Sequence, residues 1–461
     1  MNSAQRKSRS AVRSHEELTR ALAVPHNRRN FGPVSSISRA RMPISSSETP
    51  YDLAIVGASI AGCSAAVLFA RHGFRVALIE RNPDANAYKR VCTHFILSCA
   101  IPTIRRLGLC EPLERAGAVR NGAQFWTRWG WIRPPDTRED PRAWGYNIRR
   151  SKLDPLFRNM AINSPGVEYF PGESACALLE EAGRVTGVEL EKTGGANRSV
   201  RARLVVGADG RQSLIGRLSG LPQTVKPNHR VAFFTYFRDL TLATGKVSQM
   251  WLFEPDMAYA FPNDDGVTLV ACMPHKDRLA EFKKDLGGSF YRFFASVPDA
   301  PPIDRAKQVS TFFSMADMPN MSRPASRPGL ALIGDAALAS DPVWGVGCGW
   351  AFQSAEWLAD HAAEALKSGN PARLDGALEK YRNAHRSALA GHHSLICDYS
   401  ARKKLNALER LIFSAAARDP ATARHFENFG NRRISVGEFL APRALARAVR
   451  VNLTSRRNFR N

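Results

Sequence analysis

The feature that most constrains the fold is a glycine-rich turn at residues 57–62, which reads Gly-Ala-Ser-Ile-Ala-Gly. A short apolar run, residues 53–56, comes directly before it and predicts a buried parallel strand. Small residues from 63 to 72 predict a helix, and residues 75–80 predict a second strand. A strand, tight turn, helix and strand within about 30 residues form one unit of a doubly wound α/β sheet. The sequence therefore predicts a nucleotide-binding fold.

Four positions of this unit are predicted to bind a dinucleotide. Gly57 permits the tight turn after the strand, and Gly62 lets the helix pack closely on the sheet. Ser59 stands where the dinucleotide fingerprint has its second glycine, and its small side chain is expected to be tolerated beside the pyrophosphate. Free N–H groups at the helix N-terminus would bind that pyrophosphate. Glu80, at the end of the second strand, is predicted to accept hydrogen bonds from ribose hydroxyls.

Two more motifs follow predicted strands farther along the chain. Residues 207–211 read Gly-Ala-Asp-Gly-Arg, with Asp209 as the acidic residue of the turn. Residues 334–337 read Gly-Asp-Ala-Ala, where Asp335 could hold hydroxyl groups of a ligand. Residues 345–349, Gly-Val-Gly-Cys-Gly, open a predicted helix whose N–H groups would stabilise negative charge. Taken singly, each turn could be an ordinary loop or helix cap.

The composition limits which classes of protein this chain can belong to. The 461 residues are 44% hydrophobic and 23% charged, as in an ordinary globular protein of two or three domains. No window of about 18 apolar residues predicts a membrane-spanning helix. The eight cysteines include no Cys-x-x-Cys pair, so neither a disulfide framework nor a metal site is predicted. Reduced thiols and the lack of a secretory segment predict a cytoplasmic protein.

The net charge of +23 is concentrated at the two ends of the chain. Residues 1–50 carry a net charge of +6, and residues 401–461 carry +10. Such ends could contact an anionic membrane surface, although solvated basic ends are the simpler interpretation. No zinc-finger spacing or RNA-recognition signature is present, so no nucleic-acid partner is expected. The oligomeric state is not indicated.

The order of predicted elements suggests how the chain is divided. Helical and strand patterns alternate at both ends of the body, and strands with hairpin turns lie between them. The division runs as a disordered basic leader at 1–49, a discontinuous nucleotide-binding domain at 50–225 and 326–400, a β-sheet substrate domain at 226–325, and a basic helical extension at 401–461.

The three motifs, in this order, resemble those of the flavoprotein monooxygenase superfamily, which includes hydroxylases of the para-hydroxybenzoate hydroxylase type, geranylgeranyl reductases and flavin halogenases. The resemblance covers about residues 51–400, and its more specific segments are GADGRQS and GDAA-x5-P-x2-G-x-G. It implies an α/β fold: a Rossmann-like FAD-binding domain of the glutathione reductase type, an inserted antiparallel β substrate domain and a helical C-terminal region. It also implies FAD as cofactor and NAD(P)H as co-substrate.

The resemblance assigns residues of this chain to the FAD site. The matching positions are Glu80 at the adenosine ribose, Arg150 near the FAD, Asp209 in pyrophosphate and NAD(P)H handling, Asp335 at the ribityl chain, and Gly347 and Cys348 beside the isoalloxazine ring. The chain departs from many hydroxylases at Leu338, where they have histidine, and at Gly349-Trp350, where they have Gly-Asn. The segment Ser354-Ala355-Glu356 is closer to the reductase branch.

The segment 89–94 passes near the flavin in this superfamily. His94 is predicted to act as a proton donor or acceptor, because its ordinary pKa lies near neutrality. A hydrogen-bonded structural histidine is the alternative. Arg90 is predicted to bind FAD. Cys92 could be a reactive thiol, although the sequence alone indicates no lowered pKa.

Three functions remain open at this point. The leading hypothesis is an FAD-dependent monooxygenase that uses NAD(P)H and O₂, through a C4a-peroxyflavin, to oxygenate an aromatic or apolar small molecule. The second is an FAD-dependent reductase or dehydrogenase of the geranylgeranyl reductase type. The third is a non-catalytic flavin-binding or anionic-surface-binding protein. Residues 129–134, Trp-Gly-Trp-Ile-Arg-Pro, resemble a tryptophan-halogenase signature only in part, and we interpret them as a strand beside the substrate domain.

Overall fold

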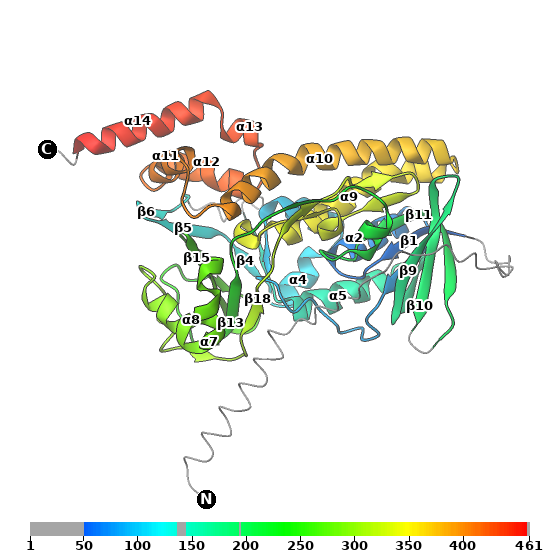
Figure 1. Cartoon of the computed structure of the whole chain (residues 1–461), viewed down its shortest axis with the longest axis horizontal. Coiled ribbons are helices and arrows are strands. Elements are labelled where there is room, and N and C mark those ends of the chain that lie inside the picture. The colour runs from blue at the N-terminus through cyan, green and yellow to red at the C-terminus, as the bar shows by residue number, and fades with distance from the viewer. Residues whose placement is uncertain (1–49, 136–143, 193–194, 459–461) are drawn as a thin grey trace, which may run out of the picture. The chain divides into compact units, whose positions relative to one another are not determined.

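The computed structural model describes residues 50–135, 144–192 and 195–458. The leader predicted for residues 1–49 lies outside the described residues. Residues 50–461 form one compact unit, in which two large sheets and a set of C-terminal helices are joined (Figure 1). The division into cofactor and substrate domains stays a prediction.

The first large sheet contains the predicted nucleotide-binding strands. Its strands, in spatial order, are β20 (Ser326–Arg327), β21 (Leu330–Leu332), β11 (Arg198–Gly207), β1 (Tyr51–Val56), β2 (Val76–Glu80) and β8 (Val167–Pro171), with β9 (Glu173–Glu181) and β10 (Arg184–Lys192) extending β11. The pairings of β21 with β11, β11 with β1, β1 with β2, and β2 with β8 are all parallel. The predicted strand–turn–helix–strand unit is therefore present at the centre of the sheet.

Helix α2 (Ile60–Arg71) connects β1 to β2 and is buried along most of its length. It begins three residues earlier than the small-residue pattern predicts, directly after the glycine-rich turn. Helices α5 (Arg150–Ile162) and α9 (Val346–Lys367) pack against α2, and α10 (Pro371–Ala401) runs beside α9 in Figure 1. Small side chains on α2 allow these close helix contacts.

The second large sheet is mostly antiparallel. Its strands, in spatial order, are β17 (Lys307–Gln308), β13 (Ala232–Arg238), β16 (Thr268–Met273), β15 (Asp256–Pro262), β14 (Ser248–Phe253), β5 (Ala123–Thr127) and β6 (Gly130–Ile132), with β18 (Phe313–Met315) also paired to β13. Strands β5 and β6 come from the segment that sequence analysis assigned to the cofactor domain. The hairpin β5–β6 contains the Trp-Gly-Trp segment, and β5 pairs in parallel with β14.

Two small sheets connect these parts. One contains β3 (Phe95–Ile96), β7 (Gly145–Asn147) and β4 (Val119–Asn121), and the other contains β12 (Thr224–Lys226), β19 (Asn320–Ser322) and β22 (Leu338–Ala339). The shorter helices of the body are α3 (Ile101–Arg106), α4 (Cys110–Arg115), α6 (Leu214–Leu218), α7 (Leu279–Lys284) and α8 (Leu286–Ala295).

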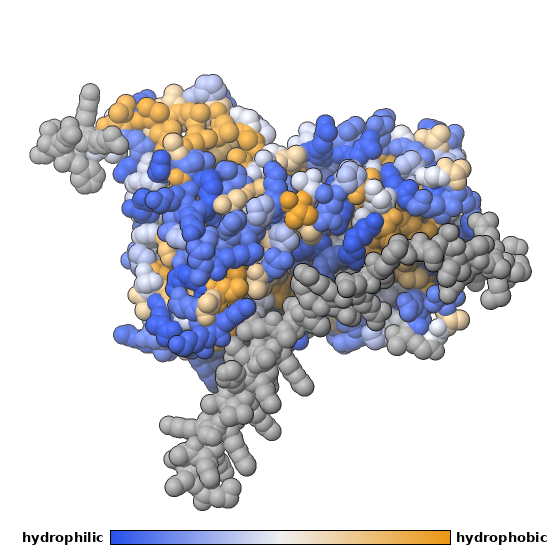
Figure 2. Space-filling view, in the orientation of Figure 1, coloured by the Kyte–Doolittle hydropathy of each residue, from blue (hydrophilic) through white to orange (hydrophobic). Residues whose placement is uncertain are grey.

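The C-terminal region is helical, as the sequence predicts. It contains α11 (Ala407–Ala416), α12 (Pro420–Gly430), α13 (Val436–Phe439) and α14 (Pro442–Asn458). Phe426 of α12 packs on Phe125 and Trp344, with ring centroids 5.2 and 5.8 Å apart. These helices thus contribute to the core under the second sheet. On the face shown in Figure 2, hydrophobic residues gather over these helices. Val449 and Leu453 of α14 are exposed hydrophobic residues.

Two absences concern only the described part of the chain. None of its helices is long and apolar enough to cross a membrane. Across residues 50–135, 144–192 and 195–458, no group of His, Cys, Asp or Glu side chains is arranged to hold a metal ion.

Candidate functional site

The glycine-rich turn is built so that only glycine fits at two positions. Gly57 has a φ of +106°, and a Cβ there would lie 2.6 Å from the Ala208 carbonyl oxygen. A Cβ on Gly62 would lie 1.8 Å from the carbonyl oxygen of Gly57 itself. Helix α2 starts at once after the turn, and the side chain of its N-cap, Ser59, makes no capping hydrogen bond. The first N–H groups of the helix therefore remain available to an anion.

Glu80 lies at the carboxyl end of β2, beside this turn. Its Oε2 accepts a hydrogen bond from the Ala58 N–H at 2.9 Å, and its Oε1 accepts one from the Asn82 N–H at 3.0 Å. Each carboxylate oxygen keeps a further lone pair. The side chain is thus held in place while it can still accept hydrogen bonds from ribose hydroxyls.

Asp209 of the middle motif caps helix α6. Its carboxylate accepts hydrogen bonds from the N–H groups of Leu214 and Ile215, at 2.6 and 3.1 Å, and from the Ser213 hydroxyl. The motif lies against the first turn, since a Cβ on Gly57 would lie 3.1 Å from the Asp209 Cα. The structure thus places the middle motif beside the glycine-rich turn. The Asp209 carboxylate stabilises the N-terminal end of α6.

Arg150 explains why a serine can stand in the dinucleotide turn. The guanidinium is buried and donates to Asp154 Oδ1 at 2.7 Å and to Ser59 Oγ at 2.6 Å. Ser59 thereby connects the turn to α5. A glycine at position 59 would leave that Arg150 nitrogen without this partner.

Asp335 lies next to a cation from the segment that follows β2. Lys89 Nζ is 3.0 Å from Asp335 Oδ2, and the Lys89 N–H donates to Asp154 Oδ2 at 2.9 Å. Burial alone would raise the pKa of Asp335, but Lys89 and Arg211 together bring this pKa below its usual range. The third motif therefore keeps its carboxylate ionised next to Gly347, where a Cβ would lie 3.8 Å from Asp335 Oδ1.

Two cysteines from distant segments meet beside this carboxylate. A hydrogen bond from Cys348 opposes burial and, with His94 and Arg150, holds the pKa of the Cys92 thiol well below its usual range. Sharing that hydrogen bond raises the pKa of Cys348. The sequence analysis named Cys92 as a candidate reactive thiol, but it could not indicate the lowered pKa, because two of its causes, Cys348 and Arg150, lie far away in the chain.

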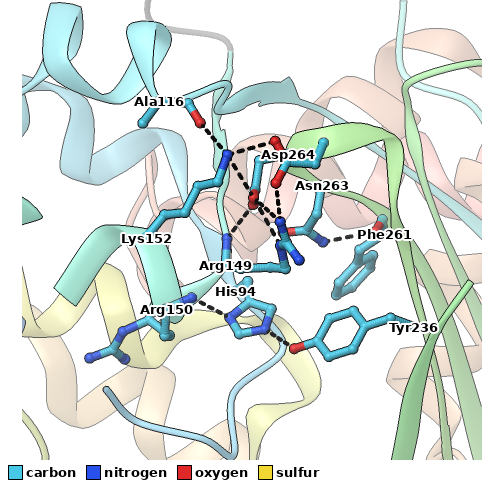
Figure 3. Close-up of polar contacts among 10 residues, drawn as sticks. His94, Ala116, Arg149, Arg150, Lys152, Tyr236, Phe261, Asn263 and Asp264 are labelled. Carbon is cyan, nitrogen blue, oxygen red and sulfur yellow. Dashed lines mark hydrogen bonds and ion pairs between the residues drawn. The ribbon is translucent and has the colours of Figure 1, made fainter. Parts of the chain in front are cut away.

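His94 lies between α5 and the second sheet, as Figure 3 shows. Its Nδ1 accepts a hydrogen bond from the Arg150 N–H at 3.2 Å, so its Nε2 carries the proton that is donated to the Tyr236 hydroxyl. The ring is buried, and the backbone adopts a φ of +64°. Both ring nitrogens have partners, which agrees with a positioning role; the proton-transfer role stays a prediction.

A second polar network in Figure 3 fixes the β15–β16 turn to α5. The buried Asp264 carboxylate accepts hydrogen bonds from the Arg149 N–H at 2.7 Å and from the Arg149 guanidinium at 2.6 and 2.8 Å. Lys152 Nζ lies 3.4 Å from the same carboxylate and donates to the Ala116 carbonyl oxygen. The sequence Asn-Asp-Asp-Gly predicted this turn. Its contacts with Arg149 and Lys152 attach the second sheet to α5.

Arg90 differs from the other predicted site residues. It is exposed, and among the described residues it has no hydrogen-bond partner. Its role in FAD binding stays a prediction. Sequence reasoning missed Lys89, although it is the neighbour of Arg90, and also missed Arg158, which donates to the Ala58 carbonyl oxygen at 3.0 Å. Lys89 is the first residue of the segment 89–94 that the sequence analysis singled out, although no role was assigned to it there.

A pocket lies beside these segments, under the C-terminal helices. It is lined by Phe95, Leu97, Asn121, Gly122, Ala123, Phe125, Met250, Trp344, Glu427, Gly430 and Asn431. Phe95 directly follows His94, and its ring lies 2.9 Å from where a Cβ on Gly345 would stand. The pocket therefore shares walls with the two segments predicted to border the flavin ring.

The residues present fit a flavin dinucleotide. The turn at Gly57 and Gly62 and the free N–H groups of α2 suit a pyrophosphate, and Glu80 retains acceptor capacity for a ribose. Asp335 is an ionised acceptor for polyol hydroxyls. Each of these features comes from a different motif, and the fold brings all three together.

Comparison with known proteins agrees with this geometry. The chain is 28% identical over 346 residues to digeranylgeranylglycerophospholipid reductase 2 of Methanothermobacter thermautotrophicus, covering 71% of this chain and 80% of that protein. It is 29% identical over 318 residues to 6-methylpretetramide 4-monooxygenase of Streptomyces rimosus, covering 66% of this chain and 73% of the relative. The fold is similar to that of a flavin-dependent brominase, with a TM-score of 0.72, 17% identity and coverage of 88% of this chain and 100% of that one.

Residues 50–390 match the family described as FAD binding domain, which is well over half of the chain. The match spans all three glycine motifs and the second sheet. The chain therefore belongs to the FAD-binding-domain family and is an FAD-dependent oxidoreductase.

Proposed function

We propose that the protein is a monooxygenase that uses NAD(P)H and O₂ to oxygenate an aromatic or otherwise apolar small molecule. The observation that carries this proposal is the pocket beside His94. Its walls combine the aromatic rings of Phe95, Phe125 and Trp344 with a few polar side chains. Such a lining suits a flat ring with polar substituents better than a long hydrocarbon chain.

When bound and reduced, FAD would supply the chemistry that transfers one atom of O₂ to the substrate. The residues of the chain bind and orient. Gly57, Gly62 and Glu80 hold the nucleotide end, and Asp335 holds the polyol chain. His94 keeps the segment 92–95 fixed through Tyr236 and the Arg150 N–H. Helix α12 and the residue that follows it line one side of the pocket, where Phe426 packs on Phe125.

The relative from Streptomyces rimosus, whose name states a monooxygenase activity, supports the proposal. The second candidate is a reductase of C=C bonds, because the relative from Methanothermobacter thermautotrophicus is a lipid reductase of similar identity and greater coverage.

We also propose that the protein is located in the cytoplasm, because its cysteines are free thiols.

The test begins with the purified protein and its visible spectrum, which should contain the bands of bound flavin. NADH or NADPH is then added in air with a panel of aromatic compounds. A monooxygenase incorporates one ¹⁸O atom from ¹⁸O₂ into a product, and the substrate accelerates consumption of the reduced nicotinamide. A product that gains two hydrogens and no oxygen would instead identify a reductase.

A further inference from the structure

The outward face of helix α14 carries apolar side chains that no described residue covers. Five large hydrophobic side chains of the described residues are exposed, and two of these, Val449 and Leu453, lie one turn apart on α14, with exposed fractions of 44% and 58%. Ala446 is also exposed and lies about one turn before Val449. This spacing places Ala446, Val449 and Leu453 on one side of the helix, where they form an apolar stripe. In Figure 2, hydrophobic residues gather over the C-terminal helices, at the end of the molecule where Figure 1 shows α14.

The opposite face of α14 is packed, so the apolar stripe belongs to an anchored helix. Ala448 is buried, and Asn452 Nδ2 donates to the Leu411 carbonyl oxygen of α11 at 3.0 Å. Arg447 donates to both carboxylate oxygens of Asp419, at 2.8 and 2.9 Å, which holds α14 against the start of α12. The helix therefore presents the apolar stripe in a fixed direction, away from the core.

Arginines line one side of the apolar stripe, and no acidic residue of the helix balances them. The sequence of α14, PRALARAVRVNLTSRRN, contains five arginines and neither Asp nor Glu. Arg443 and Arg450 are exposed, and in the part of the chain that the structure describes their side chains form no hydrogen bond or ion pair. At 3.6 residues per turn, these two side chains project roughly 70–90° from the centre of the stripe. Their charges therefore lie beside the apolar side chains, on the exposed half of the helix.

Charge decides which partner fits this face. A second copy of α14 would bring the same arginines together, and the basic leader, with a net charge of +6 over residues 1–50, would be repelled as well. An anionic lipid bilayer suits both features of the face, because its headgroups attract arginines and its acyl boundary accepts apolar side chains. A helix that lies in the plane of such a surface needs one apolar face with basic residues beside it, which is the arrangement on α14.

We propose that α14 docks the protein on an anionic phospholipid surface, with the apolar stripe entering the headgroup region and Arg443 and Arg450 contacting lipid phosphates. The charge of the C-terminal end left open whether this end is solvated or contacts a membrane, and the apolar stripe favours the membrane. The docking is peripheral and reversible, because two large apolar side chains bury far less apolar surface than a spanning helix does. It does not depend on which reaction the enzyme catalyses.

The experiment measures how the full-length, FAD-loaded protein binds to large unilamellar vesicles, by sedimentation. One set of vesicles contains phosphatidylcholine alone, and the other contains phosphatidylcholine with phosphatidylglycerol. Each arginine near an anionic surface contributes about fivefold to the partition coefficient, so the wild type should bind the anionic vesicles at least tenfold more tightly. Added NaCl should weaken this binding. Slower hydrogen–deuterium exchange of residues 442–455 in the presence of anionic vesicles would locate the contact on α14.

Two double variants separate the apolar stripe from the charge. Val449→Ser combined with Leu453→Ser changes side chains that are exposed in the protein, so the fold is kept while the affinity for anionic vesicles falls tenfold or more. Arg443→Gln combined with Arg450→Gln should lower the affinity by a similar factor and make it less sensitive to NaCl.

Matched controls lie elsewhere on the surface. Val225→Ser changes an exposed valine of β12, and Lys192→Gln changes an exposed cation at the end of β10. Both should bind the anionic vesicles as the wild type does. Flavin absorbance and circular dichroism show whether each variant is folded.

The proposal fails if the wild type binds neither kind of vesicle or binds both equally. It also fails if the variant with serines at positions 449 and 453 binds as the wild type does, because the association would then be purely electrostatic and would suit an acidic protein as well. A wild type that is dimeric in solution, and that becomes monomeric with the same two serines, would overturn the proposal by identifying a second copy of the chain as the partner.

Discussion

The nucleotide-binding region and the pocket region are built from the chain in opposite ways. The turn, helix α2 and strands β1 and β2 lie within residues 51–80, so their contacts are local in sequence. The pocket takes Phe95, Phe125, Met250 and Trp344 from four separate segments and closes with α12 from a fifth. Local spacing can encode a turn and the helix that follows it, whereas a pocket between distant segments has no such signal. Substitutions in one region test this difference when their effect on the other region is measured.

The largest effect is expected from Gly62→Ala. The new Cβ would lie 1.8 Å from the Gly57 carbonyl oxygen, so the turn must open and the site for the pyrophosphate is lost. The variant should be purified without flavin absorbance. Gly376→Ala on α10, where a Cβ has open space, is the control and should bind FAD normally. Normal FAD content in Gly62→Ala would show that this turn does not form the cofactor site.

Phe426→Ala perturbs the pocket region alone. The substitution removes ring contacts with Phe125 and Trp344 and leaves a cavity, so the free energy of unfolding should fall by about 3–5 kcal/mol. The affinity for FAD should not change. Chemical denaturation and flavin fluorescence titration measure the two quantities. A parallel loss of FAD affinity would mean that the regions are energetically coupled and that the comparison drawn above is too simple.

Asp335→Ala tests the third motif. Loss of a hydrogen bond to a charged acceptor should weaken FAD binding by about 1.5–3 kcal/mol, which fluorescence titration can measure. The variant also leaves Lys89 without its partner. Asp360→Ala on α9, at an exposed position, should bind FAD as the wild type does. An unchanged dissociation constant for Asp335→Ala would remove this residue from the site.

The smallest effect concerns the pH dependence of stability. Burial lowers the pKa of His385 to about 4, below the ordinary value of about 6.5 in the unfolded chain. Only the unfolded state binds this proton between those values, so the contribution to stability is complete above pH 6.5 and is lost as the pH falls toward 4. Between pH 7 and pH 5, His385→Leu should reduce the loss of unfolding free energy by about 2 kcal/mol. Equal losses in variant and wild type, measured with urea at both pH values, would contradict this.

Several elements could be predicted from sequence because their determinants lie close together. The glycine spacing and apolar runs indicated β1, α2 and β2, and the Asn-Asp-Asp-Gly segment indicated the turn between β15 and β16. The strands β5 and β6 could not be assigned to the second sheet, because their pairing with β14 joins residues more than a hundred positions apart. Sequence spacing carries no information about such a partner.

The sequence by itself determined the cofactor class: three short motifs, each with glycines or carboxylates required at one turn, define the family and its FAD. Only the tertiary structure decided what surrounds that cofactor. Ser59 acquires a role through Arg150, and Cys92 acquires its lowered pKa mainly from Cys348, with His94 and Arg150. The pocket takes its walls from segments as far apart as Phe95 and Asn431. The physical reason is that backbone turns are set by neighbouring residues, whereas burial, charge and hydrogen-bond partners depend on which distant segments pack together.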